Sequence, residues 1–405
     1  MQVYIGIDWS ENKHDAVFIN EAGAILAVVT FTHSVEGLEK FEAVRQDLGL
    51  APDEVIVGLE TAHNLLIDYL WAHNYTQVYV VPPSVVKGAR KRYRQSRART
   101  DESDAELIAN LLRTDRQRLY PWYPDSLLTR QMRSRISLHM HLTRSSVRLS
   151  NRLRAVLLRY YPAALQVFSK LSAPITLNFI LTYPTPQAAA RLGYEAFEAF
   201  ARQHKHSCHR QLPSLYAKLQ SPHLDASPET VAIFREEAVT LATLLLNTVQ
   251  ARKNNQRTLR QLVSQHPDSH IFASLPGAGD FLQSGLLAKF GDDRQRFPAP
   301  GSLQSLAGTC PVTIQSGQRK SIRFRKSCDR EFRYIAQQWA ISSLKKSVWA
   351  NAYYQQVRPR CRSKNHAYRC LANRWLAIAW KLWHTRQPYD EAYHMQQRMK
   401  RSMLK

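Results

Sequence analysis

Four acidic residues in the first third of the chain have the types and positions of a divalent-metal site. Asp8 and Glu60 each end a stretch whose apolar pattern predicts a β-strand. Asp101 and Asp104 are three residues apart at the start of a predicted helix, so their carboxylates project from one face. Carboxylates that come together repel one another unless a cation lies between them, and oxygen ligands favour Mg²⁺ or Mn²⁺ over zinc. The sequence therefore predicts a magnesium site, in which manganese could substitute.

Each of these acids also has a structural alternative. Thr100 or Asp101 could cap the helix, and acidic residues in a first turn complement the helix dipole. The two strand-end acids could be solvated termini, and Asp15 or Asp68 could replace either of them as a ligand. The order of the four acids along the chain nevertheless favours the metal site.

The elements that position these acids follow from the apolar periodicity. Three strands joined by a turn at 20–23 form a predicted antiparallel meander, and helices and strands then alternate. The expected strands span residues 3–7, 16–19, 24–31, 55–59 and 78–81, and the expected helices between them span 35–44 and 65–71. This order is that of the ribonuclease H fold, also called RuvC-like. In that fold the first strand, the fourth strand and a later helix bring carboxylates to one edge of the sheet.

The charge of the chain indicates a polyanionic partner. Among 405 residues, 56 Lys and Arg face 32 Asp and Glu, which gives a formal net charge of +24. Nucleic acid is the leading candidate for such a partner. An anionic membrane would also attract this charge, but no apolar run approaches the roughly 20 residues that span a bilayer. The N-terminus does not resemble a signal peptide, so we expect a protein of the bacterial cytoplasm.

A basic run lies between the fifth strand and the acidic helix. Such runs are often simply solvated. Here the position would let the cations neutralise phosphates beside the carboxylates, with an affinity that falls as salt rises. The six predicted phosphate contacts are Arg90, Lys91, Arg92, Arg94, Arg97 and Arg99.

After Pro124 the sequence becomes strongly helical and basic. Long amphipathic helices are predicted at about 127–160 and 228–262, and short helices with proline-containing turns lie between them. Two such helices can pair as an antiparallel coiled coil, within one chain or between two chains. The predicted organisation is a RuvC-like domain at residues 1–125, a helical coiled-coil linker at 126–265 and a mainly helical C-terminal domain at 266–405.

The cysteines do not have the spacing of a disulfide framework or a zinc site. There are five, an odd number, and none forms a CxxC pair. The cluster of His204, His206 and His209 beside Cys208 is more typical of a polar surface loop than of a metal site. We therefore interpret the cysteines as reduced thiols. The tryptophans beyond residue 330 recur at helical spacing, which favours a core role over base stacking.

Two motifs in the C-terminal third could contact phosphate. The turn around Gly277 and Gly279 would free backbone N–H groups to face an anion, as in helix-hairpin-helix DNA binding. Further on, Ser316 precedes a glycine and lies among cations that could hold a phosphate against its hydroxyl. Because no neighbouring base is evident, the residues alone favour a turn over a nucleophile at Ser316. The nearby cations are Arg319, Lys320, Arg323 and Arg325.

Taken together, the motifs resemble those of the DEDD transposases of the Piv-like insertion-sequence family one hundred and ten, which includes bridge-RNA-guided serine recombinases. The resemblance covers nearly the whole chain. One departure is Cys310, where a small residue such as alanine is expected. The motifs that carry the resemblance are Tyr4 to Asp8, Gly58 to Thr61, Arg99 to Asp101 with Asp104, Leu275 to Gly279, and Ala307-Gly308 through Gln315-Ser316-Gly317.

The resemblance implies a function for these motifs. The four acids would be the DEDD ligands of Mg²⁺, and Ser316 would be the nucleophile that joins DNA as a phosphoserine ester. Acidic and serine domains of different protomers would combine in a tetramer assembled from dimers. A noncoding bridge RNA would pair with donor and target DNA. Two alternatives stay open: a RuvC-like nuclease or junction resolvase that uses water, and a basic nucleic-acid-binding protein without catalysis.

Overall fold

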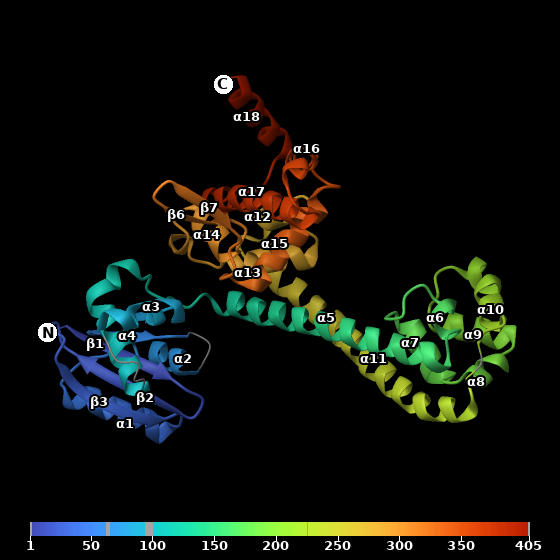
Figure 1. Cartoon of the computed structure of the whole chain (residues 1–405), viewed down its shortest axis with the longest axis horizontal. Helices are drawn as coiled ribbons and strands as arrows, with labels where there is room; N and C mark the ends of the chain where they lie inside the picture. The colour runs from blue at the N-terminus through green and yellow to red at the C-terminus, as the bar shows by residue number, and fades with distance from the viewer. Residues whose placement is uncertain (1, 62–64, 94–99, 225, 404–405) are drawn as a thin grey trace. The chain divides into compact units, whose positions relative to one another are not determined.

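The chain folds into two compact units, Met1–Pro124 and Asp125–Lys405 (Figure 1). The structure is a computed structural model that describes residues 2–61, 65–93, 100–224 and 226–403. The predicted linker and C-terminal domain lie together in the second unit, and their separation at residue 265 stays a prediction. None of the helices in these described ranges is long and apolar enough to cross a membrane.

The N-terminal unit consists of a β-sheet and the helices that cover it. Its elements in chain order are β1 (Val3–Trp9), β2 (Lys13–Ile19), β3 (Ile25–Thr32), α1 (Val35–Asp47), β4 (Val55–Leu59), α2 (Leu65–Ala72), β5 (Gln77–Val80), α3 (Pro83–Tyr93) and α4 (Asp101–Asp115), with a 3₁₀ turn at Arg116–Arg118.

The described strands of this unit form one mixed sheet in the order β3-β2-β1-β4-β5. β1, β2 and β3 pair antiparallel, whereas β1 pairs parallel with β4, and β4 pairs parallel with β5. This arrangement confirms the predicted ribonuclease H-like fold. The parallel pairs matter for function because parallel strands bring their carboxyl ends to the same edge of the sheet.

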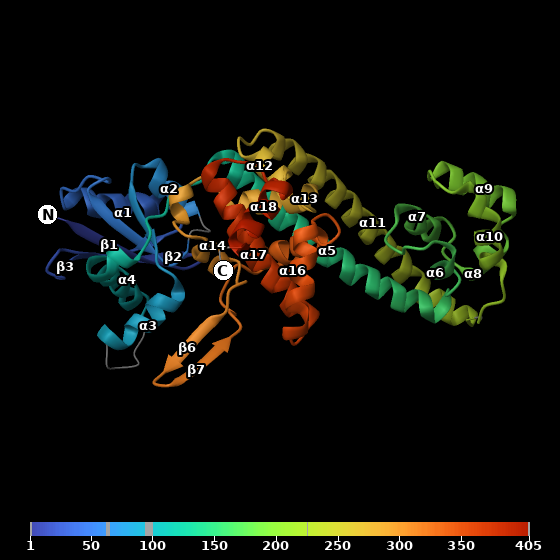
Figure 2. The same ribbon diagram turned by 90° about the horizontal axis from the view of Figure 1, so that it is seen from above.

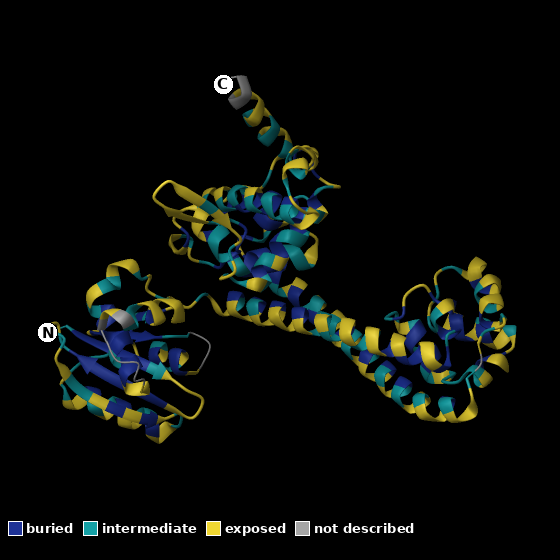
Figure 3. Ribbon diagram, in the orientation of Figure 1, coloured by how far each residue is buried: buried dark blue, intermediate teal, exposed yellow. Residues whose placement is uncertain are grey.

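Alternating side chains divide the sheet between two apolar cores. Val3, Ile5 and Ile7 of β1 pack toward α1 and α2, whereas Tyr4 packs with α3 and α4 on the opposite face. Because β1 is covered on both faces, its residues from Val3 to Ile7 are all buried (Figure 3). The β1 residues Tyr4, Gly6 and Asp8 therefore share the face that α4 covers.

The C-terminal unit is mainly helical, as predicted. Its elements in chain order are α5 (Leu127–Tyr160), α6 (Ala164–Val167), α7 (Pro174–Thr182), α8 (Pro186–Ala190), α9 (Tyr194–Gln203), α10 (Leu212–Gln220), α11 (Pro228–Ser264), α12 (Ser269–Ala273), α13 (Asp280–Phe290), α14 (Pro300–Leu306), β6 (Val312–Ser316), β7 (Arg319–Arg323), α15 (Arg330–Ser343), α16 (Val348–Val357), α17 (Lys364–Thr385) and α18 (Glu391–Met403), with 3₁₀ turns η2 (His209–Gln211), η3 (Arg294–Arg296) and η4 (Arg358–Arg360).

The long helices α5 and α11 run side by side in opposite directions (Figure 2). Near one end, Met132 of α5 packs in the same core as Val263 of α11. Near the other end, Leu157 of α5 shares a core with Ala238 of α11. The pairing of the two predicted amphipathic helices is confirmed, while knobs-into-holes packing of the coiled-coil type stays a prediction.

Each end of this helix pair carries a set of shorter helices with its own core. α6 to α10 pack around one end, and α12 to α17 pack around the other (Figure 1). In the second set, Trp339, Trp375 and Trp383 are fully buried. The predicted core role of these tryptophans is therefore confirmed.

Candidate catalytic sites

Asp8 and Glu60 lie at the carboxyl ends of neighbouring parallel strands. In the β1–β4 ladder, Ile7 is the partner of Leu59, so the next residue of each chain segment is one of the two acids. Adjacent strands are about 4.8 Å apart, and both acids are half-buried. The ladder therefore sets the backbones of Asp8 and Glu60 side by side at one edge of the sheet. Within the described residues, no three of the four predicted acidic ligands have carboxylate oxygens within 4.8 Å of one another.

α4 crosses directly over these strands because two glycines allow it. Gly6 and Gly58 are partners in the β1–β4 ladder. A Cβ atom at Gly6 would lie only 2.0 Å from the carbonyl oxygen of Ala105, and one at Gly58 would lie 2.7 Å from Leu112. The approach at Gly6 is possible only without a side chain, because backbone atoms of α4 cannot move aside, whereas the contact at Gly58 is with the end of a leucine side chain. The residue before Ala105 is Asp104, so the start of α4 is held beside the acidic ends of β1 and β4.

The first turn of α4 is organised by a capping box rather than by its acids. The Thr100 side chain accepts a hydrogen bond from the Ser103 backbone N–H at 3.2 Å, and the Ser103 hydroxyl accepts one from the Thr100 N–H at 3.1 Å. Thr100, not Asp101, is the N-cap. Asp101 is exposed, and Asp104 is 2% exposed. Neither acid is needed to cap the helix, which favours a functional role for both.

The guanidinium of Arg90 in α3 donates a hydrogen bond to each carboxylate oxygen of Asp104. Its Nε lies 3.1 Å from Oδ1 and its Nη2 lies 3.0 Å from Oδ2, which is the bidentate geometry of a strong charge-assisted pair. Arg92 forms a second ion pair, with its Nη1 2.9 Å from Oδ2 of Asp115 at the other end of α4. The sequence predicted phosphate contacts for both arginines, and the structure gives both of them carboxylate partners.

The remaining predicted cations of this run are not placed. Arg94, Arg97 and Arg99 lie outside the described residues, as does the side chain of Lys91. Their contact with phosphate stays a prediction.

Asp15 and Asp68, the alternative metal ligands, differ in their position relative to the sheet. Asp15 of β2 is the cross-strand partner of Asp8 and therefore lies on the same face of the sheet. It is buried, accepts a hydrogen bond from the Thr30 hydroxyl and lies 3.7 Å from the Lys13 ammonium. Asp68 is exposed on α2, the helix that packs on the opposite face. Asp15 could contribute to a site on the α4 face, whereas Asp68 is poorly placed to do so.

The contact at Gly6 gives a prediction about stability. Gly6→Ala is expected to destabilise the chain by about 1–3 kcal/mol or more, because the new methyl group would overlap backbone atoms of α4 that have no rotamer to change. Gly88→Ala in α3 is the matched control: a Cβ there meets nothing within 4 Å, and alanine should stabilise the helix by about 0.5–1 kcal/mol. The urea midpoint of the full chain, measured for each variant, reports the change in stability. Equal shifts in the two variants would show that α4 does not pack closely against Gly6.

Ser316 lies at the tip of an exposed β-hairpin. β6 and β7 pair antiparallel, and Ser316 faces Arg319 in the last pair before the turn (Figure 2). Gly317 has φ of 55° and is the first residue of this two-residue turn, which is the position where a type II′ turn requires glycine. The turn is therefore Gly317-Gln318. Ser316, for which the residues alone favoured a turn position, is the last residue of the strand before it.

The hairpin register sorts the surrounding cations by face. Residues directly opposite share a face, and side chains alternate along each strand. Arg319 and Arg323 therefore lie on the face of Ser316, whereas Lys320 lies on the other face with Gln315. Arg325 follows the hairpin and its carbonyl accepts a hydrogen bond from Arg333. Among the described residues, no general base lies within hydrogen-bond distance of the Ser316 hydroxyl.

The predicted glycine turn at residues 275–279 forms one side of a groove. Gly277 has φ of 76°, and a Cβ there would lie 2.6 Å from the backbone of Ser342, so both the turn and its packing need glycine. The turn opens α13, and the exposed Lys345 and Lys346 line the same groove. The Ala278 N–H donates to the Leu275 carbonyl within the turn, and α13 begins without a side-chain cap. A helix start beside two lysines is a surface suited to a phosphate.

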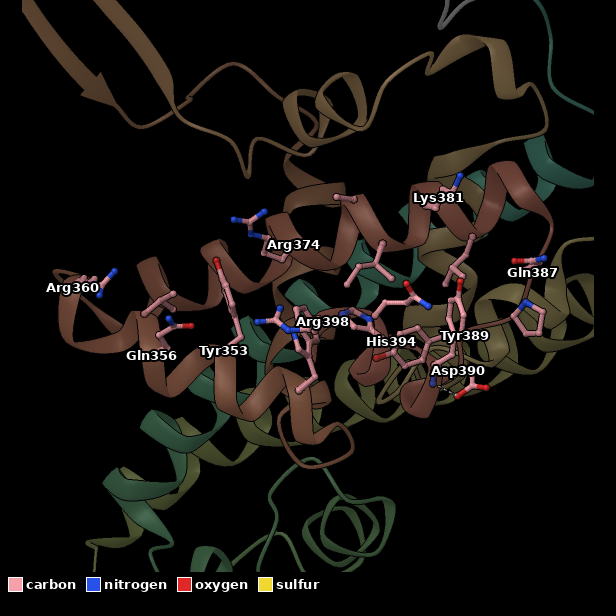
Figure 4. Close-up of a pocket in the computed structure, with 18 residues that line it drawn as sticks. Tyr353, Gln356, Arg360, Arg374, Lys381, Gln387, Tyr389, Asp390, His394 and Arg398 are labelled. Carbon is pink, nitrogen blue, oxygen red and sulfur yellow. Dashed lines mark hydrogen bonds between the residues drawn. The ribbon is translucent and has the colours of Figure 1, made fainter. Parts of the chain in front are cut away.

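A second groove, of about 980 Å³, lies between α16, α17 and α18 (Figure 4). Sequence analysis did not predict it, because the groove depends on how three consecutive helices pack, which the apolar pattern of each helix does not show. Its lining combines cations with aromatic rings, the composition of single-strand nucleic-acid grooves. The residues that give it this character are Arg360, Arg374, Lys381, Arg398, Tyr353 and Tyr389.

The fold and the acids at the strand ends define a ribonuclease H-like domain. Comparison with protein-family models agrees. Residues 5–162 match the DEDD-type IS110 model, described as "Transposase", and residues 269–355 match the "Transposase IS116/IS110/IS902 family" model. The chain belongs to this family of insertion-sequence transposases. Membership in a DEDD family implies the use of a divalent metal ion, and transposition implies DNA binding.

Individual relatives extend the similarity over almost the whole chain. The "Mini-circle putative transposase for IS117" of Streptomyces coelicolor is 29% identical over 398 residues, which are 96% of each chain. The "Insertion element IS116 uncharacterized 44.8 kDa protein" of Streptomyces clavuligerus is 27% identical over 94% of each chain. The "Insertion element IS900 uncharacterized 42 kDa protein" of Mycobacterium paratuberculosis is 25% identical over 96% of this chain and 98% of its own.

Proposed function

We propose that this transposase cuts and rejoins DNA with two groups that act together: a magnesium ion held by Asp8, Glu60, Asp101 and Asp104, and Ser316 as a covalent nucleophile. The observation that carries the metal half is the convergence of two strand ends and the start of α4 at one edge of the sheet. The serine half is supported by the hairpin register, which sets Arg319 opposite Ser316. The decisive test is whether DNA becomes covalently attached to Ser316.

The donor set fits a hard divalent cation. All four side chains offer carboxylate oxygens, the ligands that Mg²⁺ prefers, and a cation would relieve their mutual repulsion. When bound, the ion would polarise an oxygen of the scissile phosphate. Asp104 is buried, and Arg90 balances its charge; a metal ion held by Asp104 would compete with Arg90 for this carboxylate.

The serine step balances without an external energy source. The Ser316 oxygen attacks phosphorus and forms a phosphoserine ester, while the bond from phosphorus to one deoxyribose oxygen breaks. The serine proton passes to water at the exposed hairpin tip, and the deoxyribose oxygen leaves as a hydroxyl after taking a proton. A deoxyribose hydroxyl of another strand then reverses the step and frees the serine. Arg319 stabilises the extra negative charge on the phosphoryl oxygens during both steps.

The partners of the reaction are donor DNA, target DNA and a noncoding bridge RNA. The formal charge of +24 suits a load of several nucleic-acid strands. The cationic aromatic groove of Figure 4 and the turn at Gly277 and Gly279 offer contacts that do not depend on sequence. Base pairing by the RNA would supply the choice of site. Dimers would assemble to a tetramer in which acids and serine of different protomers combine.

A water-using nuclease or junction resolvase is the second candidate function. It is favoured by one observation: among the described residues, Ser316 has no hydrogen-bonded base to activate it. A metal-activated water molecule needs only the acidic site. The two candidates differ in a single product, because only the serine mechanism leaves DNA attached to the protein.

The ion pair between Arg90 and Asp104 predicts how magnesium binding responds to mutation. Arg90→Gln is expected to lower the Mg²⁺ concentration at half-maximal thermal stabilisation by about 10-fold, since a charge-assisted pair of about 1.5–3 kcal/mol no longer competes for the carboxylate. Arg92→Gln removes an arginine of the same helix that pairs with Asp115 instead and should leave the midpoint unchanged. A higher midpoint in Arg90→Gln than in the wild type would place the magnesium ion away from Asp104.

A further inference from the structure

Three soft metal ligands come together at the start of α17, in a part of the C-terminal unit that the proposed transposition chemistry does not use. They are the Cys361 and Cys370 thiols and the His366 imidazole, and one ligand atom from each lies within 4.8 Å of the other two. All three side chains are half-buried. The cysteines are free thiols, as expected, and the fold brings two of them together beside a histidine, which their spacing in the sequence did not indicate.

Local structure holds each ligand in place. Cys361 directly follows the 3₁₀ turn η4, and its carbonyl accepts a hydrogen bond from the Arg358 guanidinium at 3.2 Å. Ser363 caps α17 by accepting a hydrogen bond from the His366 N–H at 3.2 Å. His366 and Cys370 are four residues apart in that helix and therefore lie on one face, one turn above the other.

We propose that Cys361, His366 and Cys370 bind one zinc ion. Two sulfurs and one imidazole nitrogen form the donor set that zinc prefers, and magnesium avoids it. Zinc bonds of about 2.3 Å to sulfur and about 2.0–2.1 Å to nitrogen place the donors of one tetrahedral ion about 3.4–3.8 Å apart. The observed upper limit of 4.8 Å between the donor atoms is about 1 Å above this range. A water molecule would complete the tetrahedron.

Charge balance favours zinc once the thiols lose their protons. Thiolates and not thiols bind zinc, so the ion would displace the thiol protons as it binds. Two thiolates then cancel the charge of the dication. The neutral site can coexist with the neighbouring Arg369 and Arg374, whereas an uncompensated dication beside them could not.

The site would brace one wall of the cationic aromatic groove. Arg360 precedes Cys361 in the chain and lines that groove together with Arg374 of α17 (Figure 4). A zinc ion would tie the η4 turn to α17 and so fix Arg360 relative to Arg374. This role is structural and independent of magnesium, Ser316 and any DNA-joining step.

The test is the zinc content of the purified full chain after its affinity tag is removed. One zinc ion per chain is expected, and Cys361→Ser and Cys370→Ser should lose it. Cys208→Ser is the matched control because Cys208 lies beside His206, in the other cluster of histidines, and it should keep the zinc. In the cobalt-substituted chain, thiolate-to-cobalt absorption should be present in the wild type and absent in Cys361→Ser.

A second measurement needs no variant. A chelator that removes zinc should lower the thermal midpoint of the wild-type chain, and equimolar zinc should restore it while magnesium should not. Three results would overturn the proposal: a chain without zinc and without cobalt–thiolate absorption, zinc that is retained by Cys361→Ser, or a Cys361–Cys370 disulfide that makes the isolated chain two hydrogens lighter.

Discussion

Ser316→Ala is expected to abolish the covalent protein–DNA adduct and all strand exchange, a loss on the order of 10³-fold or more, while the chain stays folded and still binds DNA. The hydroxyl is the only group removed, and it lies at the exposed tip of the β6–β7 hairpin, so little packing is lost. The measurement is a denaturing gel of labelled donor and target DNA incubated with the protein, Mg²⁺ and RNA transcribed from the flanking sequence.

The hairpin register supplies matched controls for this experiment. Arg319→Ala removes the cation on the serine face and should slow adduct formation by about 10²- to 10³-fold, the usual cost of losing one charge-stabilising donor. Lys320→Ala removes a neighbouring cation on the opposite face and should change the rate only slightly. Free cleavage products that carry no protein and survive Ser316→Ala would instead establish the water-using nuclease.

This contrast between Arg319 and Lys320 illustrates what the sequence could and could not predict. The cations around Ser316 were visible, but their faces depend on which residues form the turn. A register shift of one residue would exchange the two faces. The positive φ of Gly317 fixes a two-residue turn and hence the register. The types of side chain near Ser316 were thus predictable from the sequence. The face of the hairpin on which each cation lies was not, because it depends on the backbone conformation of the turn.

The acidic site likewise has features that the sequence predicts and others that depend on the fold. Period-2 strands and the capped helix predicted where Asp8, Glu60 and Asp104 occur in the fold, because those patterns are local. The reason they meet is not local: Gly6 and Gly58 become neighbours only when β1 pairs with β4, and that pairing lets α4 descend onto the sheet. The capture of Asp104 by Arg90 was missed for a related reason, because it joins two separate helices.

The zinc ligands were missed because their spacing has no CxxC element. Cys361 belongs to a turn and His366 and Cys370 belong to a helix, so the three meet only when the η4 turn folds back on the first turns of α17. The His-x-x-x-Cys spacing on a helical face was the signal available in the sequence. It became meaningful only once α17 was known to begin at Lys364.

Asp8→Asn and Glu60→Gln are expected to reduce Mg²⁺-dependent DNA cleavage and adduct formation on the order of 10³-fold or more, because each amide keeps the shape of the acid but removes a charged oxygen ligand. The thermal stabilisation by Mg²⁺ should disappear as well. Asp68→Asn, on the opposite face of the sheet, should leave both properties unchanged. Full Mg²⁺ stabilisation in Asp8→Asn would remove Asp8 from the site, whatever happened to activity.

These variants also test whether acids and serine of different protomers combine. Asp8→Asn chains retain Ser316, and Ser316→Ala chains retain the acids, so each alone should be inactive. If the active centre is shared between protomers, mixed assemblies contain centres that pair an intact Asp8 with an intact Ser316, and part of the adduct should return. If both groups act within one chain, no centre in the mixture is complete. A mixture of Asp8→Asn with Glu60→Gln must stay inactive in the shared arrangement, because every centre that it forms has a damaged acidic half.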